Sequence, residues 1–185
     1  MPILPSEPWL SFLSDINQKL PYRTDLHCCG GFTVTQAYGI SRTTRDLDYL
    51  RAVPNHSEDL LAEVGGQGSA LHKKHGVYLD PVKIITPPDN YQSRLIPLFI
   101  GAWSNLRLYA LEPHDLVLSK LERHYTRDSE DVGMLELTGR LRVDVLKKRY
   151  LEEVRPYLVN LSRHDLTMKI WCKTYFGSDF QSPSD

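Results

Sequence analysis

Two short motifs constrain this chain more than any other feature of its sequence. Cys29-Gly30-Gly31-Phe32 joins a predicted strand to a predicted helix, and Asp46 and Asp48 lie on the next predicted strand. Side chains two residues apart on a strand point to the same face, so the two carboxylates converge. Glycines before a helix let backbone N–H groups approach a phosphate at the helix N-terminus. The combination predicts a phosphate-binding backbone beside a divalent metal ion, which favours nucleotide chemistry.

A third acid, Asp80, lies in an otherwise apolar strand predicted over residues 77–85. If that strand neighbours the one with the acid pair, three carboxylates meet. Two like charges about 4 Å apart repel by about 4 kcal/mol at an effective dielectric of about 20, so such a cluster favours Mg²⁺ or Mn²⁺. The alternative is that the earlier pair are surface acids neutralised by Arg42 or Arg45. Pro81 lacks a backbone N–H group, which predicts an edge strand or a bulge.

Candidate residues in the second half of the chain each have two interpretations. Lys120 falls inside the apolar side of a helix predicted to begin at Pro113. Its amine either contacts a triphosphate as a point charge or extends to water at the edge of that side. Asp131 is either a site acid or part of a helix cap. Arg123 contacts phosphates or pairs with neighbouring glutamates.

Composition is that of an ordinary globular protein and excludes several classes. Of the 185 residues, 41% are hydrophobic and 24% are charged, and the net charge of −1 predicts no global field that attracts nucleic acid. Three cysteines, two of them adjacent at Cys28 and Cys29, do not make a disulfide framework. The N-terminal sequence predicts no signal peptide, and no apolar run is long enough to span a membrane. We therefore expect a cytoplasmic protein.

The pattern of elements predicts an α+β fold. Strands are predicted over 25–29, 46–53, 77–85 and 106–111, with helices between them, and only helices follow residue 113. This indicates a small mixed β-sheet with flanking helices, followed by a helical C-terminal half. We place the core domain at 1–111 and the helical region at 112–185.

The order of these motifs resembles a known signature. Gly30-Gly31, then Arg42-x-Thr44-x-Asp46-x-Asp48, then Asp80 is similar to the motif of the nucleotidyltransferase superfamily that includes DNA polymerase beta. The segments Leu118–Arg123 and Arg127-Asp128-x-x-Asp131 are similar to abortive-infection type nucleotidyltransferases and to uncharacterised bacterial nucleotidyltransferase-like proteins. The resemblance extends over residues 25–135.

The resemblance implies a role for each motif. Asp46 and Asp48 would bind Mg²⁺ or Mn²⁺ and the triphosphate, and Asp80 would activate an acceptor hydroxyl or hold a second metal ion. Lys120 matches the lysine that contacts the nucleotide, so the region 112–185 would contribute to the nucleotide site. The other implied nucleotide-binding residues are Gly30, Gly31, Arg42, Thr44, Arg123 and Asp131.

The resemblance also implies a reaction. The protein would transfer NMP from an NTP to a hydroxyl of an RNA, such as tRNA, or of a protein. It would act as the toxin of a toxin–antitoxin module, with a cognate antitoxin as its partner. The alternative is a protein of the same fold that binds nucleotide or a partner with weak or no catalysis.

Overall fold

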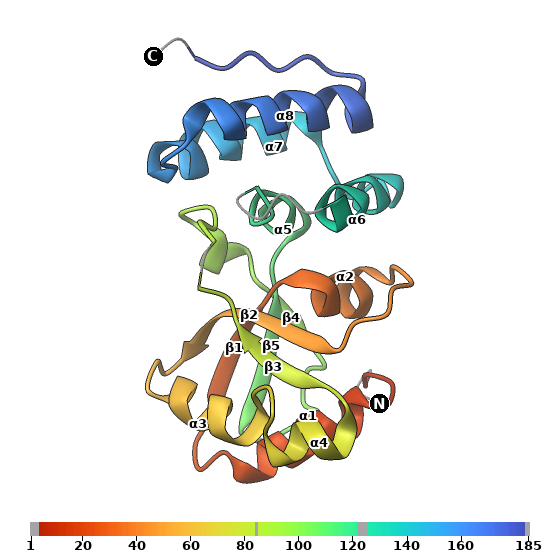
Figure 1. The fold of residues 1–185 in the computed structure, drawn as a ribbon, viewed down its shortest axis with the longest axis vertical. Coiled ribbons are helices and arrows are strands. Elements are labelled where there is room, and N and C mark those ends of the chain that lie inside the picture. Colours follow the sequence, from red (N-terminus) through yellow and green to blue (C-terminus); the bar gives the residue numbers. More distant parts are fainter. Residues whose placement is uncertain (1–3, 84, 122–125, 184–185) are drawn as a thin grey trace. The chain divides into compact units, whose positions relative to one another are not determined.

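The computed structural model describes residues 4–83, 85–121 and 126–183. Its described strands form a sheet in the order β3-β2-β1-β5-β4, which confirms the predicted α+β class. The strands are β1 (Thr24–Cys28), β2 (Asp46–Val53), β3 (Tyr78–Pro81), β4 (Ile96–Leu98) and β5 (Leu106–Ala110). The longer helices are α1 (Trp9–Lys19), α2 (Gly30–Tyr38), α3 (Ser57–Gly65), α4 (Ala70–His75), α5 (Pro113–Leu118), α6 (Thr126–Leu137), α7 (Val143–Arg149) and α8 (Leu161–Phe176) (Figure 1).

The chain divides into two compact units. The first unit comprises Met1–Lys83 with Leu95–Leu111, and the second unit comprises Ile84–Arg94 with Glu112–Asp185. The first unit contains the whole sheet together with α1 to α4. The second unit contains α5 to α8 and three short helical segments, η1 (Tyr91–Arg94), η2 (Tyr150–Val154) and η3 (Arg155–Tyr157).

The hydrophobic core of the first unit lies on one face of the sheet. Helices α1, α3 and α4 gather on that side (Figure 1). Trp9, Phe12, Leu13 and Ile16 give α1 an apolar side at helical spacing, and all four are buried. Leu61 of α3 joins them against the strands. The opposite face of the strands is therefore left for polar side chains.

A β-bulge decides which residues of β2 face that core. The pairing of β1 with β2 shifts after His27 and leaves Leu50 of β2 without a direct partner. The shift places Tyr49 on the same face as Ala52, and both side chains are buried in the core. Because side chains alternate along a strand, the two acids of β2 point to the opposite face.

Strand β3 lies at the edge of the sheet, as Pro81 predicts. The N–H groups of Tyr78 and Val82 donate to carbonyls at Arg45 and Tyr49, at 3.0 and 2.9 Å. Since alternate residues of a strand face the same neighbour, position 81 turns its nitrogen away from β2. Proline therefore removes no hydrogen bond from the β2–β3 pairing.

Some predicted elements differ from the observed ones. The strand predicted over 77–85 ends at Pro81, and the first unit continues only to Lys83 before the chain passes to the second unit. Strand β4 was not predicted, since its three residues are too few to show alternation. Residues 143–157, which lie in the predicted helical half, form α7 followed by η2 and η3 instead of one continuous α-helix, with Pro156, which lacks an N–H group, inside η3.

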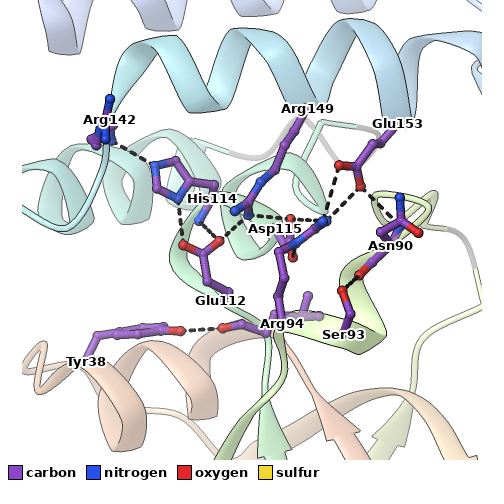
Figure 2. Close-up of polar contacts among 11 residues, drawn as sticks. Tyr38, Asn90, Ser93, Arg94, Glu112, His114, Asp115, Arg142, Arg149 and Glu153 are labelled. Atoms are coloured by element: carbon purple, nitrogen blue, oxygen red, sulfur yellow. Dashed lines mark hydrogen bonds and ion pairs between the residues drawn. The ribbon is translucent and has the colours of Figure 1, made fainter.

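The second unit is organised around a buried carboxylate, Asp115 (Figure 2). Arg94 donates to both of its oxygens, at 2.8 and 3.0 Å, and Arg149 donates to one of them at 2.9 Å. Arg94 also donates to Glu153, at 2.7 Å, and Arg149 donates to Glu112. These contacts join the segment Ile84–Arg94 to α5, α7 and η2.

Glu112 and His114 extend this network at the start of α5. The Nε2 atom of His114 accepts the backbone N–H of Arg142 at 2.8 Å. The ring proton therefore lies on Nδ1, which donates to Glu112 at 2.7 Å. Burial opposes ionisation of Glu112, but the bonds from His114 and Arg149 outweigh it and lower its pKa to about 2. Glu112 is therefore ionised over the whole physiological range.

Candidate active site

Three carboxylates converge on the face of the sheet opposite the core. Asp48 and Asp80 are direct partners across the parallel strands β2 and β3, and Asp46 precedes Asp48 by two residues. All three side chains therefore point to one face. Oxygen atoms, one from each residue, lie within 4.8 Å of one another. The meeting of three carboxylates, predicted for neighbouring strands, is confirmed.

This donor set fits a divalent cation. Mg²⁺ bonds carboxylate oxygens at about 2.1 Å, so trans ligands in an octahedron lie about 4 Å apart. A separation of up to 4.8 Å needs only a small side-chain rotation, or two ions about 3.5–4 Å apart. Asp48 is only 7% exposed, so its charge is poorly screened by water. Hard oxygen ligands and mutual repulsion both favour a bound Mg²⁺ or Mn²⁺.

Thr44 orients the first of these acids. Its hydroxyl donates to Oδ1 of Asp46 at 2.6 Å. A carboxylate has further lone pairs, so Asp46 can still bind a metal ion while it accepts this hydrogen bond. In the structure Thr44 therefore contacts a site acid. The resemblance implies that Thr44 binds the nucleotide, and that role stays a prediction.

The glycine turn lies against the same acids. Helix α2 begins at Gly30, so the glycine pair that was predicted to precede the helix forms its first turn, and Gly30 has a φ of +66°. A Cβ atom on Gly30 would lie 1.7 Å from Oδ2 of Asp48, so only glycine lets this carboxylate approach the helix N-terminus. A Cβ atom on Gly31 would lie 3.1 Å from the Thr44 hydroxyl and 3.4 Å from Cζ of Arg42. The Arg42 guanidinium therefore lies close to the first turn of α2.

Alanine at Gly30 is expected to disrupt the site much more than alanine at Gly39. A positive φ costs a residue with a Cβ atom about 1–2 kcal/mol, and at Gly30 the Asp48 carboxylate must also move. Gly39→Ala is the matched control, because Gly39 has a φ of +71° but no atom within 4 Å of the added carbon. Urea denaturation and Mg²⁺-dependent thermal shift should show Gly30→Ala losing more stability than Gly39→Ala and losing the response to Mg²⁺. Equal behaviour of these two variants would contradict the close approach of Asp48.

Tyr78 is a site residue that the sequence analysis did not identify. It is the direct partner of Asp46 and precedes Asp80 by two residues, so it shares the face of the acids. Burial and the charges of Asp46, Asp80 and Asp48 raise the pKa of Tyr78, so its hydroxyl stays protonated at neutral pH. The two-residue spacing between Tyr78 and Asp80 puts both side chains on one face of a strand, and this spacing in the sequence could have identified Tyr78.

Lys120 and Asp131 form an ion pair inside the second unit. The Lys120 Nζ atom lies 2.7 Å from an Asp131 oxygen, and the two side chains are only 5% and 1% exposed. The amine therefore does not extend to water, and Asp131 lies within α6 rather than at its cap. A contact of Lys120 with nucleotide stays a prediction. Arg123 lies outside the described residues.

Fold and site together define a class of protein. A mixed sheet with paired acids on one strand, a third acid on its parallel neighbour and a glycine turn is the arrangement expected of the nucleotidyltransferase superfamily. The chain belongs to the family described as "Nucleotidyltransferase of unknown function (DUF6036)", whose sequence model matches residues 10–175. No curated protein and no solved structure matches the chain. The predicted superfamily is therefore confirmed.

One further finding concerns membranes. Within the part of the chain that the structure describes, every helix is too short or too polar to cross a lipid bilayer.

Proposed function

We propose that the protein is a metal-dependent nucleotidyltransferase that moves NMP from an NTP to an acceptor hydroxyl. The observation that carries this proposal is the convergence of Asp46, Asp48 and Asp80 within 4.8 Å, on the face of the sheet where α2 begins. Membership in the family supports a triphosphate substrate. In this reaction a bond forms between the acceptor oxygen and the α-phosphorus, and the bond to pyrophosphate breaks.

Different residues of the first unit have different roles in the proposed reaction. The first backbone N–H groups of α2 have no partner within the helix, and Arg42 adds a cation, so the leaving phosphates bind there. Asp46 and Asp48 hold a metal ion, which supplies positive charge to the triphosphate. Asp80 is more accessible to solvent than Asp48, and it accepts the proton of the acceptor hydroxyl or holds a second ion.

The finer parts of the proposal rest on the resemblance. They are Mg²⁺ as the ion, a tRNA or protein acceptor, a toxin role with an antitoxin partner, and a cytoplasmic location. They also include contacts of Lys120, Arg123 and Asp131 with the nucleotide, through the helical region 112–185.

Incubation with each labelled NTP, Mg²⁺ and either total RNA or total protein tests the proposal. We expect labelled product with the wild type and none with Asp46→Ala, because that change removes one of the metal ligands. Thr44→Val retains the carboxylate but removes its 2.6 Å hydrogen bond, and we expect it to retain part of the activity. Product formed equally by the wild type and Asp46→Ala would contradict the proposal.

A second candidate is a nucleotide-binding protein of this fold without turnover. It is favoured by the burial of Lys120 in an ion pair with Asp131, which commits the amine to a contact within its own unit. Calorimetry separates the two candidates, since Mg²⁺-dependent NTP binding without product would support the second.

A further inference from the structure

We propose that Tyr78, packed against His72, is the surface on which the terminal base of a nucleic-acid acceptor stacks. This inference rests on the proposed transfer reaction and names the substrate class that receives the NMP group. It is carried by three features of the first unit, namely the strand order, the contact between the two rings and the cations near β3.

Strand order places Tyr78 on the acceptor side of the acids. Strand β2 lies between β1, which leads into α2, and the edge strand β3. The phosphate-binding turn therefore approaches Asp48 from one side, and Tyr78 and Asp80 lie on the other. Phosphoryl transfer proceeds in line, with the attacking and leaving oxygens on opposite sides of the phosphorus. If pyrophosphate leaves toward α2, the acceptor enters from β3.

The Tyr78 ring is held in place by its neighbours. Its centroid lies 4.9 Å from that of His72, with the ring planes 57° apart. The His72 ring is itself fixed, because its Nδ1 atom accepts the backbone N–H of Gly68 at 2.8 Å. Tyr78 is only partly buried, so ring surface remains accessible. An ordered aromatic ring beside a reactive centre suits the stacking of an unpaired base.

Nearby cations complement a phosphate backbone. Arg45, whose carbonyl accepts the N–H of Tyr78, and Lys83, just beyond β3, are both exposed. The chain as a whole carries a charge of −1, so attraction of nucleic acid depends on local cations such as these. A serine or threonine of a protein acceptor has neither a flat base to stack on the aromatic ring nor a phosphate to attract the flanking cations. The observations therefore favour a nucleic-acid end.

Fluorescence anisotropy with a labelled RNA hairpin that has a short single-stranded 3′ end tests this inference. In Mg²⁺ we expect Tyr78→Ala to weaken binding about tenfold and Tyr78→Phe to bind as the wild type does, because the ring rather than the hydroxyl contacts the base. His72→Ala should weaken binding by a smaller factor. Tyr157→Ala, which removes an exposed tyrosine of the second unit, is the control and should bind unchanged.

Calorimetric titration of the same variants with NTP and Mg²⁺ separates this inference from the proposed function. Tyr78→Ala should bind NTP as the wild type does, since the three acids and the glycine turn remain. Unchanged RNA binding by Tyr78→Ala, or equal weakening by Tyr78→Phe, would overturn the stacking role while leaving the transferase proposal intact. Labelling of protein but not RNA would also overturn it. Absence of Mg²⁺-dependent NTP binding by the wild type would overturn both proposals.

Discussion

Asp48→Asn is expected to lower nucleotidyl transfer by about 10³-fold or more. The change keeps the size of the side chain but removes one negative charge from the cluster that we propose binds the metal ion. A metal ion supplies several kcal/mol of transition-state stabilisation, and about 4 kcal/mol corresponds to 10³ in rate. Asp48 is also the most buried of the three acids, so water replaces its charge least well. Initial rates with labelled NTP under saturating acceptor measure the effect.

Thermal unfolding provides a readout that does not depend on knowing the acceptor. Mg²⁺ at about 100 times its dissociation constant stabilises a protein that binds it by about 2.7 kcal/mol. For a chain of this size that is a rise in Tm of about 5–10 °C, which the wild type should show and Asp48→Asn should not. Asp59→Asn removes an exposed acid of α3 and should respond as the wild type does. A full Mg²⁺ response in Asp48→Asn would exclude this carboxylate as a ligand.

The sequence was most informative where local rules act. Strand β2 has the predicted bounds Asp46–Val53, because polar and apolar residues alternate at its start and Pro54 follows its end. Helix α2 ends at Tyr38, directly before Gly39, a residue type that commonly ends helices and that here has a φ of +71°. Gly30 was predicted to let the backbone approach a phosphate. The structure adds a second reason for glycine at this position, because the Asp48 carboxylate occupies the place where a Cβ atom of residue 30 would lie.

Features that depend on pairing between distant segments could not be read from the sequence. The bulge at Leu50 depends on how β2 pairs with β1, yet it decides which face the acids occupy. The position of Tyr78 beside the acids follows from its pairing with Asp46, which requires β3 to be the parallel neighbour of β2. Likewise, the partners of Asp115 are separated from it by 21 and 34 positions in the chain.

The network around Asp115 also explains why the second unit includes a short segment from the middle of the chain. Arg94 lies at the end of the segment Ile84–Arg94, and its guanidinium donates to both Asp115 and Glu153. The backbone N–H of Asn90 also donates to Glu153, at 3.1 Å. These polar contacts hold Asn90 and Arg94 against α5 and η2.

Asp115→Ala is consequently expected to destabilise the protein by about 3–5 kcal/mol. The Asp115 side chain is 0% exposed, and its removal leaves Arg94 and Arg149 without the carboxylate that both contact. Breaking a buried ion pair by removing one partner costs this much because the remaining charge stays away from water. Asp144→Ala is the matched control, since the pair between Arg142 and Asp144 is 72% and 64% exposed. Such an exposed pair contributes about 0–1 kcal/mol.

Urea denaturation of the two variants beside the wild type measures this difference. Asp115→Ala should shift the midpoint strongly, and Asp115→Asn should lie between it and the wild type, because the amide oxygen still accepts one guanidinium hydrogen bond. A double variant in which methionine replaces Arg94 and leucine replaces Asp115 should recover part of the loss, since a well-packed apolar pair avoids the cost of burying charge. If Asp115→Ala were no less stable than Asp144→Ala, the buried network would not be what holds the second unit together, and packing of the apolar sides of its helices would have to account for its stability instead.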